Sequence, residues 1–185
     1  MTRKFVLTGG PGTGKSTLLS TLQQRGIYTM KEAAEYIIER ELRREGKILP
    51  WVNRDLFQKK LLETQLQWER EIPSEIEISF QDRGIADAIA YYRIDSLQPP
   101  KEIVRAAKDA NYERVFILDP LNTYQRTEIR RESPERAREI HRQIARAYEE
   151  LGYNLTRIPA ASLNFRTELI LDLIEFDQKA LEATK

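Results

Sequence analysis

A short apolar segment that runs straight into a glycine-rich loop constrains this chain more than any other part of its sequence. Residues 4–8 read as a buried strand, residues 9–16 read GGPGTGKS, and a helical pattern begins near Lys15 and ends at Gly26. The loop fits G-x-x-x-x-G-K-[ST], in which glycine lets backbone N–H groups turn toward phosphate oxygens. The N-terminus of the following helix adds a partial positive charge. The sequence therefore predicts that residues 9–16, called the phosphate loop below, hold the phosphates of a nucleoside triphosphate.

The phosphate loop also carries the side chains that such a site needs. Lys15 is expected to bridge the β- and γ-phosphates, and the Ser16 hydroxyl is expected to be a ligand of Mg²⁺. Thr17 adds a hydroxyl near the α-phosphate. The residues expected to bind the nucleotide are Gly9, Gly10, Pro11, Gly12, Thr13, Gly14, Lys15, Ser16 and Thr17.

Strand and helix patterns alternate along the chain, which favours a parallel sheet covered by helices. Further strands are expected at 27–30, 76–80, 115–118 and 155–158, and helices at 33–46, 53–71, 85–96, 100–111, 134–151 and 162–181. Asn53 and Ser133 are suitable N-caps for two of these helices. We therefore expect a single α/β domain over residues 1–185, built on a five-stranded parallel sheet.

Magnesium needs a second protein ligand, and two aspartates compete for this role. Asp119 follows the wholly apolar run 115–118 and fits the pattern better, while Asp82 follows the strand expected at 76–80. Strand order favours Asp82, because the third strand in sequence lies beside the first in P-loop kinases. Asp82 is followed by Arg83, and such a pair can place an acid on Mg²⁺ and an arginine on phosphate. The alternative for Asp82 and Arg83 is a local ion pair, and the choice between Asp82 and Asp119 stays open.

Glu32 follows the second expected strand, at the carboxyl edge of the sheet where ligands gather in open α/β folds. Its carboxylate can accept the proton of an attacking hydroxyl group. A glutamate near a helix N-terminus is also favourable through the helix dipole alone. Glu32 is therefore a candidate general base with a structural alternative of equal weight.

Arginine is concentrated between Arg126 and Arg146, where seven arginines are accompanied by four glutamates. Those before Ser133 belong to a connection over residues 122–134, which we interpret as a lid over the phosphates. Positive charge from such a lid stabilises the transferred phosphoryl group. We assign Arg126 and Arg130 to the nucleotide, with Arg130 as the main catalytic candidate. The later arginines are expected to form ion pairs on a solvated helix.

The acceptor side is expected in the helices of residues 47–72. Four aromatic residues are candidates for lining it, although core packing is the simpler role for each: Trp51, Trp68, Tyr91 and Tyr92.

Composition excludes several other classes of protein. The 185-residue chain has no cysteine and one histidine, so disulfides and thiolate metal sites are excluded and a zinc site is improbable. Its net charge of +1 does not indicate a nucleic-acid partner. No apolar run is long enough for a membrane span or a signal peptide, so we expect a cytoplasmic protein.

With these residues in place, the chain resembles a family of small AAA-type ATP-binding domains related to the nicotinamide riboside kinase half of the bacterial NAD regulator. The resemblance rests on FVLTGGPGTGKSTL, KEAAEYIIERE, FQDRGIADAIAYYR, the arginine segment and AYEELGYNLTRIPA. It implies a P-loop fold with strand order 2-3-1-4-5. It also implies binding of triphosphate and Mg²⁺ through Gly12, Gly14, Lys15, Ser16 and Asp82.

Two functions follow from the sequence and the resemblance. The first is a kinase that transfers the γ-phosphoryl group of ATP to a small hydroxyl-bearing acceptor, with nucleosides as the model. The second is a nucleotide-dependent switch, using ATP or GTP, that engages a protein or an anionic lipid. A ring-forming AAA motor is disfavoured because Asp82 is followed by arginine, and no Asn-Lys-x-Asp motif indicates guanine. The acceptor, the base and the oligomeric state stay open.

Overall fold

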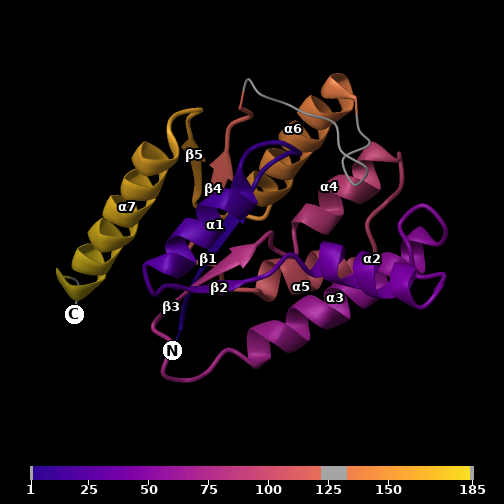
Figure 1. Ribbon diagram of the computed structural model, residues 1–185, viewed down its shortest axis with the longest axis horizontal. Coiled ribbons are helices and arrows are strands. Elements are labelled where there is room, and N and C mark those ends of the chain that lie inside the picture. The colour runs from indigo at the N-terminus through magenta and orange to yellow at the C-terminus, as the bar shows by residue number, and fades with distance from the viewer. Residues whose placement is uncertain (1, 122–132, 184–185) are drawn as a thin grey trace.

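The computed structural model describes residues 2–121 and 133–183, the last eight of them by their backbone only. Within these residues, five parallel strands form one sheet in the order β2-β3-β1-β4-β5 (Figure 1). The strands are β1 (Arg3–Thr8), β2 (Tyr28–Met30), β3 (Ile78–Asp82), β4 (Arg114–Leu118) and β5 (Leu155–Ile158). This order confirms the expected fold class.

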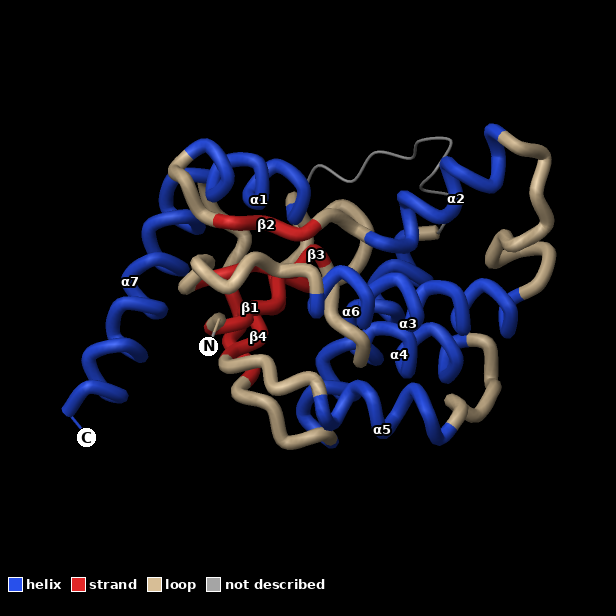
Figure 2. Tube along the Cα trace, turned by 90° about the horizontal axis from the view of Figure 1, so that it is seen from below, coloured by secondary structure: helices blue, strands red, loops and turns tan. Residues whose placement is uncertain are grey.

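Helices cover both faces of the sheet. They are α1 (Lys15–Gln24), α2 (Ala33–Arg43), α3 (Arg54–Arg70), α4 (Asp87–Ile94), α5 (Lys101–Asp109), α6 (Pro134–Glu150) and α7 (Leu163–Ala183). Helices α1 and α7 pack on one face, and α4, α5 and α6 pack on the other. Helices α2 and α3 enclose a smaller apolar cluster and lie on the far side of the sheet from α7 (Figure 2). None of the helices in the described residues is long and apolar enough to cross a membrane.

Alternation along β1 explains how the sheet divides the core. Phe5 and Leu7 face α1 and α7, while Val6 between them faces α4 and α6. Phe5 stacks on Phe80 and Phe116 of the neighbouring strands, with ring centroids 5.4 and 6.1 Å apart. β1 and β4 carry apolar residues on both faces, as is typical of strands that lie inside a parallel sheet rather than at its edge.

Both expected N-caps are present, whereas the third strand is shifted from its expected position. The side chains of Asn53 and Ser133 accept hydrogen bonds from the amides of Leu56 and Arg136. The third strand was expected at 76–80 but spans 78–82, because residues 78–82 pair in register with residues 3–7 of β1. Asp82 thus lies within the strand, directly beside Leu7 and next to the phosphate loop.

Candidate active site

The phosphate loop connects β1 to α1, and three of its glycines, Gly9, Gly12 and Gly14, have positive φ. Gly14 is the N-cap of α1 with φ of 82°, a left-handed conformation that favours glycine. Since the first-turn N–H groups of a helix have no partner within it, they are available to an anion at this end. The Lys15 ammonium lies over the loop and donates to the carbonyls of Gly9 and Gly10, each at 3.3 Å.

Lys15 is almost fully buried, which affects its charge. Burial and the nearby Arg83 guanidinium lower the pKa of Lys15 to about 8, against the opposing effect of neighbouring carboxylates. The ammonium is therefore surrounded by acidic groups and held in a site with little water. A phosphate group bound here would further favour the charged form of Lys15.

Asp82 ends β3 with its carboxylate in the same buried region. Burial, followed by the negative charge of Glu32, raises the pKa of Asp82 to about 7. Its Oδ1 atom is buried without a hydrogen-bond partner among the described residues. Burying a carboxylate oxygen without a hydrogen-bond partner costs free energy, and such an oxygen is well suited to be the ligand of a cation. Asp82 and Ser16 both line the same cavity and together fit a magnesium ion.

Asp119, the competing aspartate, has different surroundings. Its side chain is 38% exposed, and its Oδ1 atom lies 3.8 Å from Nε2 of His141. Asp119 is not among the described residues that line the cavity. The geometry therefore favours Asp82 over Asp119 as the second magnesium ligand.

Arg83 and Glu32 meet above the sheet edge. Arg83 Nε donates to Glu32 Oε1 at 3.0 Å, and Arg83 Nη1 donates to the Gly9 carbonyl at 3.1 Å. The same Nη1 donates to Asp87 Oδ2 at 2.9 Å. The guanidinium thus connects the phosphate loop to the candidate base and to an aspartate that our sequence analysis did not select.

Two further residues tie the phosphate loop to distant helices. The Gly10 amide donates to Nδ1 of His141 in α6 at 3.3 Å. Burial lowers the pKa of His141, which favours the neutral imidazole that this contact needs. Arg166 of α7 donates to the carbonyls of Thr13, Asp119 and Pro159, at 2.7, 2.9 and 3.0 Å.

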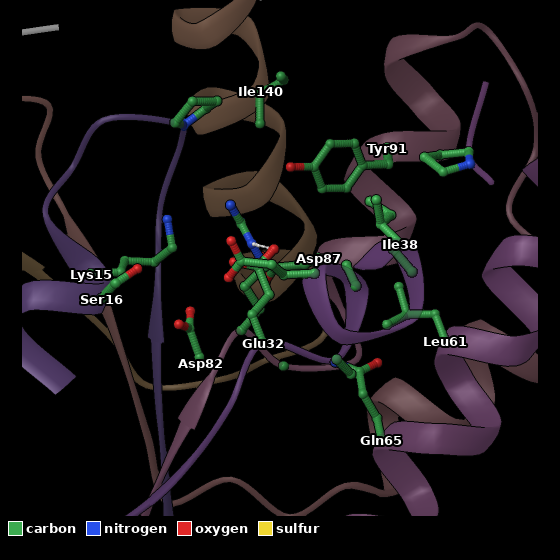
Figure 3. Close-up of a pocket in the computed structure, with 18 of the residues that line it drawn as sticks. Lys15, Ser16, Glu32, Ile38, Leu61, Gln65, Asp82, Asp87, Tyr91 and Ile140 are labelled. Atoms are coloured by element: carbon green, nitrogen blue, oxygen red, sulfur yellow. Dashed lines mark hydrogen bonds and ion pairs between the residues drawn. The ribbon is translucent and has the colours of Figure 1, made fainter. Parts of the chain in front are cut away.

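A cavity of about 380 Å³ runs from the phosphate loop to a chamber between α2, α3 and α4. Figure 3 shows Lys15 and Ser16 on one side, Leu61 and Gln65 of α3 on the other, and Glu32 between them. The wider lining of the chamber is largely apolar and comprises Ile38, Trp51, Phe57, Leu61, Ala88 and Tyr91, with Arg54, Gln58 and Gln65 as polar members. The cavity thus joins a phosphate end to an apolar end.

The four aromatic candidates have separate positions. Trp51 and Tyr91 line the cavity. Tyr92 is buried in the core and its hydroxyl donates to Asp55. Trp68 packs on Tyr36, with ring centroids 5.1 Å apart, at the cluster between α2 and α3. Core packing was therefore the correct expectation for two of the four.

The arginine segment is described only from residue 133 onward. Arg126 and Arg130, with most of the segment 122–134, fall outside the described residues. Along α6, ion pairs join Arg138 to Glu135, Arg142 to Glu139 and Arg146 to Glu150, as expected. Arg136 differs, because it pairs with Asp95 of the α4 C-terminus at 2.7 Å and lines the cavity.

The sequence analysis missed several residues that order this site: Thr8, Asp87, Tyr148 and Arg166. Asp87 lies four residues after Arg83. That spacing was a usable signal for an ion pair at the start of a helix. The others come from β1, α6 and α7, and no short spacing connects them to the phosphate loop.

The strand order and the phosphate loop define a P-loop NTPase with the kinase-like sheet. The chain belongs to a family described as an AAA domain, whose model matches residues 4–166. No curated protein matches the sequence.

Solved structures with the same fold are distant in sequence. A thymidylate kinase from Ehrlichia chaffeensis has 14% identity and a TM-score of 0.67, covering 94% of this chain and 98% of its own. A deoxyadenosine kinase from M. mycoides has 16% identity and a TM-score of 0.63, covering 93% and 98%. The NadR protein in complex with NAD and AMP-PNP has 19% identity and a TM-score of 0.69, covering 94% of this chain and 49% of its own. These likenesses show the fold, whereas the reaction has to be argued from the site.

Proposed function

We propose that this protein binds Mg²⁺ and a nucleoside triphosphate, ATP in the first instance, and transfers the γ-phosphoryl group to a small hydroxyl-bearing acceptor. Residues 1–185 act as a single domain in this proposal. Two of the proteins that share the fold are named as a thymidylate kinase and a deoxyadenosine kinase, which supports a kinase reaction.

The observation that carries the proposal is one cavity with two unlike ends. Its phosphate end is formed by residues 11–17, and its apolar end by α2, α3 and α4. A triphosphate at the first end and an acceptor at the second would meet near Glu32, which lies between the two ends (Figure 3), and near its hydrogen-bond partner Arg83. A protein that only held the phosphates of a nucleotide would have no use for a chamber that extends beyond them.

The phosphate loop supplies most of the binding. Residues 9–17 would surround the phosphates with backbone amides and hydroxyls, and Lys15 would bridge the β- and γ-phosphates. Ser16 and Asp82 would hold Mg²⁺. When bound, the ion would offset negative charge on the phosphate oxygens.

The transfer step would use Glu32 and the arginines. Glu32 would accept the proton as the acceptor oxygen bonds to the γ-phosphorus and the bond to the β–γ bridging oxygen breaks. Arg83 would stabilise the charge on the moving phosphoryl group. Arg126 and Arg130 would complete this positive surrounding from residues 122–134, where we propose the lid.

The acceptor would bind among the apolar and aromatic side chains of the chamber. Trp51 and Tyr91 offer flat surfaces to a ring, and Gln58 has a buried Oε1 atom without a hydrogen-bond partner among the described residues. Together they suit a small acceptor with an aromatic ring and polar edge groups, such as a nucleoside.

A screen of ATP and GTP against nucleosides and related hydroxyl compounds tests the proposal. Acceptor-dependent release of nucleoside diphosphate should appear with Mg²⁺. Glu32→Gln should reduce kcat by about 100-fold, within the range of general-base catalysis. Glu35→Gln is the matched control, because Glu35 lines the same cavity but is exposed, and it should reduce kcat by about twofold at most. Full turnover by Glu32→Gln would remove Glu32 from the mechanism.

The same screen also decides between the kinase and the nucleotide-dependent switch. Tight triphosphate binding without transfer to any acceptor would favour the switch. The switch further requires a partner whose affinity differs between the diphosphate and triphosphate forms.

A further inference from the structure

Arg83 has an unusual backbone conformation at the centre of the candidate site. Its φ is 66°, in the left-handed region that residues other than glycine seldom adopt. Such a conformation is strained and persists only where several contacts enforce it. The amide of Arg83 donates to the Leu7 carbonyl at 3.0 Å, which fixes the turn to β1. The side chain is therefore aimed from a constrained backbone.

Asp87 holds the other end of this arginine. Its carboxylate accepts three donors: the Thr8 hydroxyl at 2.7 and 2.9 Å, the Tyr148 hydroxyl at 2.8 Å, and Arg83 Nη1 at 2.9 Å. Asp87 is only 4% exposed. A buried carboxylate with three donors has a fixed orientation, so that Oδ2 faces the guanidinium.

Tyr148 joins α6 to the same turn. Its hydroxyl donates to Asp87 Oδ1 and accepts from the Gly84 amide at 3.1 Å. A Cβ atom at Gly84 would lie 2.5 Å from this hydroxyl, so glycine permits the close approach. Burial and the Asp87 carboxylate raise the pKa of Tyr148 well above its usual range, so the hydroxyl keeps its proton.

We infer that Asp87 and Tyr148 are positioning residues, which hold the Arg83 guanidinium between the Gly9 carbonyl and Glu32. The inference rests on the proposed phosphoryl transfer, since it assigns these residues their purpose through Arg83. The Tyr148 hydroxyl contacts both ends of the turn over residues 84–87, because it accepts from the Gly84 amide and donates to the Asp87 carboxylate. Without the Tyr148 hydroxyl, the Asp87 carboxylate can rotate toward Arg83 and draw the guanidinium away from Glu32.

The chain contains a matched control for this role. The buried Tyr112 hydroxyl accepts from the Ile85 amide at 3.2 Å and donates to Glu69 at 2.7 Å. It therefore makes the same pair of contacts one residue further along the turn. The Glu69 carboxylate pairs with Lys4 near the start of β1, whereas Asp87 pairs with Arg83. Tyr112→Phe should match Tyr148→Phe in lost hydrogen bonds but not in its effect on Arg83.

Double-mutant cycles in the full chain give the first test. Tyr148→Phe combined with Arg83→Gln should depart from additivity by about fivefold or more in the unfolding equilibrium constant, because Asp87 connects the two positions. Tyr112→Phe combined with Arg83→Gln should be additive within about twofold. If Tyr148→Phe does not fold, Thr8→Val takes its place in the cycle, because the Thr8 hydroxyl lies within hydrogen-bond distance of both Asp87 oxygens. Additivity of the Tyr148 and Thr8 cycles would overturn the inference.

Turnover gives the second test. Tyr148→Phe should lower kcat by about tenfold or more and leave the KM for Mg²⁺·ATP within about twofold, because it shifts a group at the reacting centre. Tyr112→Phe should leave kcat within about twofold. Equal kcat losses in both variants would reduce Tyr148 to a structural role. If no acceptor is phosphorylated by the unmodified chain, the proposed function fails, and the stability cycles still decide whether Tyr148 positions Arg83.

Discussion

Replacing Asp82 by asparagine should stabilise the nucleotide-free protein while abolishing its response to magnesium. Burial and the negative charge of Glu32 raise the pKa of Asp82 to about 7 in the folded chain, from the 3.8 of a solvent-exposed aspartate, which applies to the unfolded chain. A carboxyl group whose pKa is raised in the folded protein destabilises that protein as pH rises. The destabilisation is absent below the pKa of the unfolded state and is complete once the pH has risen through the pKa of the folded state. Between pH 5 and pH 8, Asp82 should therefore cost the wild-type chain about 2–3 kcal/mol of stability. An asparagine side chain cannot ionise, so Asp82→Asn should escape this loss.

Urea unfolding of both proteins at pH 5, 6, 7 and 8 measures the effect. The difference between variant and wild type isolates Asp82 together with its electrostatic coupling to Lys15 and Glu32, because the more distant titrating groups are common to both. Asp119→Asn is the control, since its exposed side chain should change stability by only about 0.5 kcal/mol at any of these pH values. Mg²⁺·ATP at 100 times its dissociation constant should stabilise the wild type and Asp119→Asn by about 2.7 kcal/mol, and Asp82→Asn by much less. Parallel stability curves for wild type and Asp82→Asn would refute the reasoning.

Three further substitutions test contacts around the phosphate loop. Gly84→Ala should destabilise the protein by about 1–3 kcal/mol in urea unfolding, because its Cβ would lie 2.5 Å from the Tyr148 hydroxyl, and unchanged stability would contradict this packing. Arg166→Met should cost about 3 kcal/mol or more, since Arg166 satisfies three backbone carbonyls, and triphosphate affinity measured by calorimetry should fall with it. His141→Gln should flatten the stability curve between pH 5 and pH 7. Because the folded pKa of His141 is lowered, the wild type has its stability above about pH 6.5 and loses it as pH falls, and an equally steep loss in the variant would exclude His141 as the cause.

Local patterns were enough to predict most of the fold. The apolar runs, the two N-caps at Asn53 and Ser133 and the phosphate loop each act over a few residues, so they can be read without knowing the tertiary structure. The position of β3 could not be predicted in this way. Gln81 and Asp82 are polar, and they are held in the strand by pairing with β1 and, for Gln81, with β2 as well. A pattern of apolar residues does not predict polar residues that are held in a strand by hydrogen bonds to a neighbouring strand.

The candidate site was predictable in part for a similar reason. Lys15, Ser16, Glu32, Asp82 and Arg83 lie at or shortly after the carboxyl ends of strands. These ends meet at one edge of a parallel sheet, so the structure brings the five residues to one cavity. Their roles stay proposals. Arg126 and Arg130 fall outside the described residues. The contacts of Tyr148 and Arg166 depend on where α6 and α7 pack, which no short sequence spacing encodes.

The hydrogen bond from Arg166 to the Thr13 carbonyl joins residues 153 positions apart. During synthesis, Thr13 leaves the ribosome long before Arg166 is made. The central strand β1 must likewise wait for β4 before both of its edges are paired. An emerging chain therefore has the phosphate-loop sequence well before it has a fixed phosphate loop. Nucleotide binding should mature late in translation, and loop-closure entropy over such separations predicts slow folding of this region.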